Sequence, residues 1–103
     1  MTDQVDLLIA ILFDNEARED ERHDAAMDIG DFDDHRALNA LMKIAANPAE
    51  NEIILDACGE SLAQIWVKRN FFDIKAYNQL QPQAQHVAKA YIKTNRPEWL
   101  KLL

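Results

Sequence analysis

Cysteine, glycine and proline are scarce in this chain of 103 residues, and each shortage excludes a class of protein. Cys58 is the only cysteine, so no disulfide can form within the chain, which fits a reducing compartment. Two glycines, three prolines and 49% hydrophobic residues favour a compact helical protein over a disordered one. No apolar run approaches the roughly 20 residues of a membrane-spanning helix. We expect a single domain comprising residues 1–103.

The first 14 residues, MTDQVDLLIAILFD, are rich in aliphatic side chains but do not have the pattern of a signal peptide. A signal peptide begins with a basic region, whereas this segment has no basic residue and carries Asp3 and Asp6. We therefore expect a helix of the folded domain here, and a cytoplasmic protein that does not bind membranes.

Acidic side chains are concentrated in the first part of the chain. The net charge is −7, but residues 1–60 carry 16 acidic and 4 basic side chains, whereas residues 61–103 carry 2 acidic and 7 basic ones. An acidic half attracts a basic partner and is repelled by the phosphates of nucleic acid. Charge alone is equally compatible with solvated helix faces that are simply acidic.

The spacing of apolar residues predicts two helices joined by a short turn within residues 36–66. In both helices apolar side chains recur at i, i+3, i+4 and i+7, as on a one-sided helix. Asn47-Pro48 ends the first helix, because the residue before proline disfavours helical geometry. Asn51 can then cap the second helix. The side chains expected at the buried seam of this hairpin are Leu41, Cys58, Leu62 and Trp66.

A shift of 33 residues aligns this hairpin with an earlier one, which indicates an internal repeat. Val5 falls on Leu38, Ile29 falls on Leu62, and the predicted turn at Asp14-Asn15 falls on Asn47-Pro48. Asp3 is the expected N-cap of the first helix, and the second is expected to start near Glu16. Asp34 is the expected N-cap of the third helix.

The last part of the chain predicts a less regular third unit. A short helix within residues 71–80 is followed by Pro82, which suits the first position of a final helix that ends at Asn95 and Pro97. A divergent last unit is typical of repeat proteins, because a terminal repeat shields the end of the stack. The side chains expected to cover that end are Tyr91, Trp99, Leu100 and Leu103.

Two segments, DAAMDIGDF and ACGESLAQI, resemble HEAT repeats of the short bacterial kind. That pattern has paired alanines, an aliphatic residue, a glycine or alanine, and another aliphatic residue. The first copy matches it at Ala25, Ala26, Ile29, Gly30 and Phe32, and the second at Ala57, Cys58, Leu62, Ala63 and Ile65. The resemblance, which covers roughly residues 3–68, implies an all-α, right-handed α-solenoid of about three helical hairpins with a divergent last unit.

Patterns that would indicate a metal site or an enzyme are incomplete. The acidic segment DIGDFDD is not an EF-hand, because a loop starting at Asp31 has Arg36 at the glycine position and Met42 at the glutamate position. The three histidines lack the spacing of a metal site. Ser61 has no histidine at helical spacing to act as a base. We expect no enzymatic activity, no metal and no cofactor.

The candidate binding surface is instead a set of carboxylates on two predicted helices. A row at i, i+4, i+8 and i+11 lies on the second helix and consists of Asp20, Asp24, Asp28 and Asp31. A second row lies on the equivalent helix of the next unit and consists of Glu52, Asp56 and Glu60. The remaining candidates are Asp33 and Asp34. Like charges four residues apart destabilise a helix, and Arg18 and Arg22 are expected to offset only part of that repulsion. In HEAT-like solenoids the second helices line the concave face, so the resemblance implies that both rows border one groove.

Size, acidity and helical class are similar to those of small immunity proteins from bacterial contact-dependent inhibition systems. That resemblance implies a protein that binds and neutralises a basic toxin, such as a nuclease, through its acidic helix face. The alternative is a HEAT-like regulatory adaptor or scaffold subunit in a bacterial complex. In either case we expect a basic protein partner and no direct contact with nucleic acid or membrane. The oligomeric state stays open, with a monomer favoured.

Overall fold

The computed structural model describes residues 3–103, which form seven helices and no strand. The predicted all-α class is therefore confirmed for this part of the chain. The helices are α1 (Gln4–Phe13), α2 (Glu19–Ile29), α3 (His35–Ala45), α4 (Glu52–Arg69), α5 (Ile74–Gln79), α6 (Pro82–Asn95) and the 3-10 helix η1 (Pro97–Leu102).

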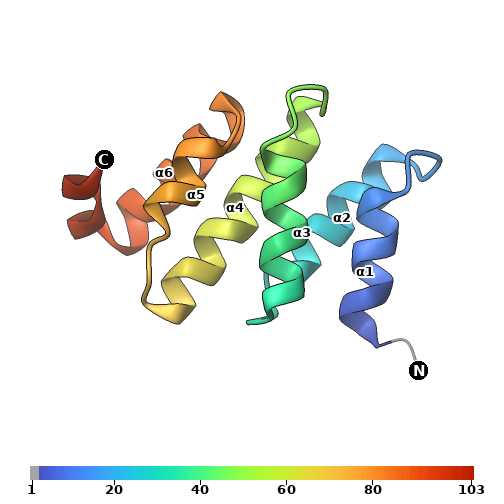
Figure 1. The fold of residues 1–103 in the computed structure, drawn as a ribbon, viewed down its shortest axis with the longest axis horizontal. Coiled ribbons are helices and arrows are strands. Elements are labelled where there is room, and N and C mark those ends of the chain that lie inside the picture. Colours follow the sequence, from blue (N-terminus) through green and yellow to red (C-terminus); the bar gives the residue numbers. More distant parts are fainter. Residues whose placement is uncertain (1–2) are drawn as a thin grey trace.

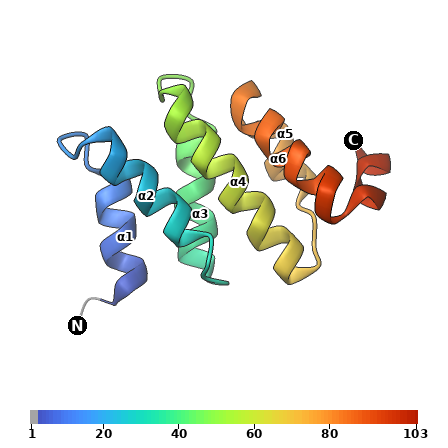
Figure 2. The same cartoon turned by 180° about the vertical axis from the view of Figure 1, so that it is seen from behind.

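The helices lie in two layers. Figure 1 shows α1, α3 and α5 in the nearer layer, and Figure 2, seen from behind, shows α2, α4 and α6 side by side in the other. Within the hairpins α1 packs against α2 and α3 against α4, while α4 also packs against both α2 and α6. Helices α1 and η1 lie at opposite ends of a molecule that measures 39 × 29 × 20 Å (Figure 1).

Local sequence explains where the helices begin. Carboxylate or amide oxygens of Asp3, Asp34 and Asn51 accept hydrogen bonds from backbone N–H groups in the first turns of α1, α3 and α4, at 3.0, 2.8 and 2.9 Å. These caps and Pro82 at the start of α6 confirm the predictions. Helix α2 begins at Glu19, later than predicted.

The late start of α2 has a local cause in the turn after α1. The Asp14 carboxylate accepts a hydrogen bond from the Glu16 N–H at 2.9 Å, and the Asp14 carbonyl accepts one from the Ala17 N–H at 3.1 Å. These bonds hold residues 14–17 in a turn, so helical geometry can start only after them.

The 33-residue spacing is reproduced in the second helix of each hairpin, since α2 begins at Glu19 and α4 at Glu52. Ile29 and Leu62, which the shift makes equivalent, are both fully buried. The predicted seam is confirmed, because the structure buries all of its members: Leu41, Cys58, Leu62 and Trp66.

Small side chains let the helices of the second layer approach closely. A Cβ atom on Gly59 would meet the backbone carbonyl oxygen of Ala84, so the α4 and α6 backbones almost touch there. On the opposite side of α4, the Ser61 hydroxyl donates a hydrogen bond of 2.6 Å to the Ala26 carbonyl of α2. These two contacts define which sides of α4 face α6 and α2.

The C-terminal segment covers the core in part. The Trp99 ring stacks on Phe72 with centroids 5.5 Å apart, and Tyr91 and Leu100 are half-buried against the core. The prediction for Leu103 is wrong, because its side chain is 45% exposed. Leu103 follows the last residue of η1, and the stacking contact with Phe72 is made by Trp99.

Candidate protein-binding surface

The acidic row on α2 lies opposite the buried face of that helix. Arg22, Ala25, Ala26 and Ile29 are buried, and with 3.6 residues per turn the intervening aspartates fall on the outer side. The side chains of Asp20 and Asp24 are 70% and 78% exposed, and Asp28 is also exposed. The structure therefore leaves these carboxylates accessible to a partner.

Of the four basic side chains in residues 1–60, Arg22 and Arg36 form ion pairs with carboxylates outside the row. Arg18 contacts the row, with its Nε atom 3.3 Å from the Asp20 carboxylate. Lys43 belongs to α3, in the other layer. Arg22, which was expected to offset the row, is buried and donates from Nε to the Leu12 carbonyl at 2.9 Å. The charge of the row is consequently less compensated than the sequence suggested.

Arg22 also forms a buried ion pair with Glu50, in the turn before α4. The guanidinium and the carboxylate make two hydrogen bonds of 3.0 and 2.8 Å, and their side chains are only 10% and 9% exposed. Hydrogen bonds from Arg22 hold the pKa of Glu50 below its ordinary value, and Glu50 raises the pKa of Arg22 in return. The pair ties the first hairpin to the second. The burial of Arg22 could have been predicted from the internal repeat, because the 33-residue shift aligns Arg22 with Leu55, which is buried.

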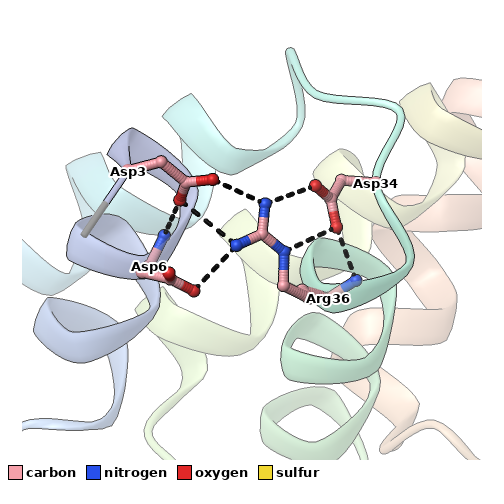
Figure 3. Close-up of polar contacts among 4 residues, drawn as sticks. All are labelled: Asp3, Asp6, Asp34 and Arg36. Carbon is pink, nitrogen blue, oxygen red and sulfur yellow. Dashed lines mark hydrogen bonds and ion pairs between the residues drawn. The ribbon is translucent and has the colours of Figure 1, made fainter. Parts of the chain in front are cut away.

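Arg36 engages three further carboxylates, as Figure 3 shows. Its guanidinium contacts Asp3 at 2.9 Å, Asp6 at 2.9 Å and Asp34 at 2.7 Å. Hydrogen bonds from the Arg36 side chain and backbone lower the pKa of Asp34 to about 2, and the same side chain lowers the pKa of Asp3. Asp34, a candidate binding residue from the sequence, thus caps α3 and joins it to α1.

The other candidate carboxylates differ in how far they are engaged. Asp33 forms an ion pair with Arg69 at the end of α4, and Asp31 accepts a hydrogen bond of 3.3 Å from Gln64. Asp56 accepts a hydrogen bond from the Gln83 side chain of α6. Glu52 is exposed in the first turn of α4, and Glu60 is half-exposed further along that helix.

Asp24 and Asp28 of the α2 row face away from α4. Ala26 and Gly30 mark the side of α2 that faces α4, since their carbonyl oxygens accept hydrogen bonds from Ser61 and Lys68 of that helix. At roughly 100° per residue, Asp24 and Asp28 lie about 160° around α2 from that side. They therefore face away from α4, at the end of the layer. That both rows border one groove stays a prediction.

The only cysteine, Cys58, is buried in α4. Burial raises the pKa of the Cys58 thiol to about 12, so the thiol stays protonated. In residues 3–103 no three His, Cys, Asp or Glu side chains are grouped to hold a metal ion. Nor does this range contain a helix long and apolar enough to cross a membrane.

The fold and this surface together define a small all-helical protein with an exposed, largely uncompensated acidic helix. Comparison with known protein families, curated proteins and solved structures finds no match.

Proposed function

We propose that this chain is a non-enzymatic protein-binding module of HEAT-like α-solenoid architecture, which binds a basic protein through the outer face of α2. The specific function that we propose is that of an immunity protein, which neutralises a basic toxin such as a nuclease. The observation that carries the proposal is the exposure of Asp20, Asp24 and Asp28, while Arg22 and Arg36 bind other carboxylates.

Electrostatics explains what such a row is suited to bind. Aspartates four residues apart repel each other and destabilise the helix by a few tenths of a kcal/mol per pair. Lysine or arginine side chains of a partner relieve this repulsion and are steered toward the row by its field. Association should therefore slow as salt concentration rises.

A basic nuclease is a suitable partner because it uses cationic side chains to hold the phosphates of its substrate. A row of carboxylates that occupies those side chains blocks the nucleic acid from binding. This accounts for an inhibitor that needs no chemistry of its own.

The alternative is a regulatory adaptor or scaffold subunit in a bacterial complex. Apolar side chains outside the acidic row favour this second candidate, since Phe71 is 63% and Ile53 is 49% exposed. Exposed apolar side chains of this size are common at protein interfaces.

The test is affinity capture from the native host, followed by titration of the recovered basic protein. We expect the triple variant Asp20→Asn, Asp24→Asn, Asp28→Asn to lose about 10- to 100-fold in affinity at low salt. A matched control, Glu16→Gln, Glu19→Gln, Glu98→Gln, changes the net charge equally at exposed positions outside the row and should bind like the parent. Parental affinity of the aspartate variant would contradict the proposal, and capture of a multi-protein assembly would favour the adaptor.

A further inference from the structure

The two ends of the α2–α4–α6 layer carry opposite charges at the same spacing. Acidic side chains lie at i, i+3 and i+7 on α2, and a histidine followed by two lysines lies at i, i+3 and i+7 on α6. The acidic end row consists of Glu21, Asp24 and Asp28, and the basic end row of His86, Lys89 and Lys93; all six side chains are exposed. At 1.5 Å rise per residue, each row is about 10 Å long.

In the basic end row, Lys89 lies opposite the α4-facing side of α6, and His86 and Lys93 lie to one side of it. Gln83 and Ala84 mark the side of α6 that meets α4, through the hydrogen bond to Asp56 and the close approach to Gly59. At roughly 100° per residue, the members of the basic end row lie about 140–200° around α6 from Ala84 and about 60–120° from Gln83, and Lys89 lies farthest from the midpoint between these two residues. They border a shallow hollow lined by His86, Lys89, Ala90 and Lys93.

The acidic end row is placed in the corresponding way on the first helix of the layer. Asp24 and Asp28 lie on the side of α2 that faces away from α4. Helix α4 lies between α2 and α6 (Figure 2), so the two end rows belong to the helices at opposite ends of the layer.

Both ends of the molecule also expose aliphatic side chains. Leu7 and Ile11 of α1 are 55% and 38% exposed, and Leu102 and Leu103 at the opposite end are 53% and 45% exposed. End faces of stacked helices usually carry a polar outer surface, and exposed apolar side chains there indicate a further contact.

We propose that a second copy of this chain docks head to tail, with its acidic end row on the basic end row of the first copy. The α2 helix of one copy then lies beside α6 of the other, as α6 lies beside α4 within the chain. A second copy is the occupant that fits, because the same molecule presents both charges at one spacing and exposes aliphatic side chains at both of its ends. Such a contact is heterologous, so it leaves one free end of each kind and can be repeated.

This inference does not rest on the proposed function, although it uses Asp24 and Asp28 as well. A basic partner and a second copy would therefore compete for α2. The basic end row takes part only in self-association, which allows the two ideas to be tested separately.

The experiment is sedimentation velocity of the purified chain over a range of concentrations and salt. Raising the salt from about 0.01 M to about 1 M shortens the Debye length from about 30 to about 3 Å. We expect the sedimentation coefficient to rise with protein concentration at low salt and to fall to the monomer value at high salt. A monomer at every concentration in low salt would overturn the inference.

Charge reversal distinguishes this arrangement from other modes of association. The variants Asp24→Lys/Asp28→Lys and Lys89→Glu/Lys93→Glu should each be monomeric alone, because each then presents like charges at both ends. A mixture of the two should associate, and so should the chain that carries all four changes. The control Glu16→Lys/Glu98→Lys should associate like the parent, with circular dichroism confirming that each variant is folded.

Two outcomes of this series overturn the inference. One is association that survives both charge-reversed variants, and the other is a mixture that stays monomeric. Lys89→Glu/Lys93→Glu should still bind the captured basic protein. If that binding persists while the parent never self-associates, the head-to-tail contact fails and the proposed function stands.

Discussion

The hairpins α1–α2 and α3–α4 follow one sequence pattern but differ in what surrounds them. Ile44 of α3 is 5% exposed, whereas Ile11, its equivalent under the 33-residue shift, is 38% exposed. Helix α3 lies inside its layer, whereas α1 lies at the end (Figure 1). Periodicity therefore selects the apolar face of a helix, while the neighbouring helices decide how much of that face is buried.

The hairpins also differ at one buried position of their second helices. Leu55 of α4 is 6% exposed, and its equivalent in α2 is Arg22, at 8%. A buried leucine needs only close packing, whereas a buried guanidinium needs partners, which Glu50 and the Leu12 carbonyl supply. The first hairpin is thus joined to the second by a directional polar contact.

The largest expected effect comes from making the hairpins alike at this position. Arg22→Leu should lower the free energy of unfolding by about 3–5 kcal/mol, because it leaves the buried Glu50 carboxylate unpaired. Urea denaturation measures this loss. The double variant Arg22→Leu/Glu50→Leu should regain much of the stability, and a double variant no more stable than the single one would show that Glu50 is not the cause.

A smaller effect is expected from truncating the equivalent isoleucines. Ile44→Ala should cost about 2–5 kcal/mol, as large-to-small core changes do. Ile11→Ala should cost less than about 1 kcal/mol, since its side chain already contacts solvent. Denaturation of both variants under one condition tests the comparison directly, and equal losses would mean that α1 is covered in solution.

The smallest effect concerns the exposed Arg36 cluster that joins the N-caps of α1 and α3. Asp34→Asn keeps a capping side chain but removes the charge, so we expect a slight decrease in Tm at neutral pH. Because folding lowers the pKa of Asp34 from 3.8 to about 2, its stabilisation is present above pH 3.8 and is lost as pH falls through about 2. Thermal melts of parent and variant should converge over that range; a constant difference would assign the effect to the cap alone.

Much of the fold could be predicted from the sequence because its determinants are local. The caps Asp3, Asp34 and Asn51 bind N–H groups two or three residues away, and the buried seam follows the 3.6-residue period. The same period predicts that Asp20 and Asp24 lie on the exposed face of α2. This part of the candidate surface could therefore also be predicted from the sequence.

The contacts between helices could not be predicted from the sequence and are known only from the tertiary structure. Arg22 meets Glu50 across 28 residues, and Arg36 meets Asp3 across 33, which no local pattern encodes. Asp33 and Asp34 belong to the acidic segment DIGDFDD, but in the folded chain Arg69 binds Asp33 and Arg36 binds Asp34. The physical reason is range: helical periodicity and capping act within a turn or two, whereas the direction in which a carboxylate faces depends on which helices pack beside its own.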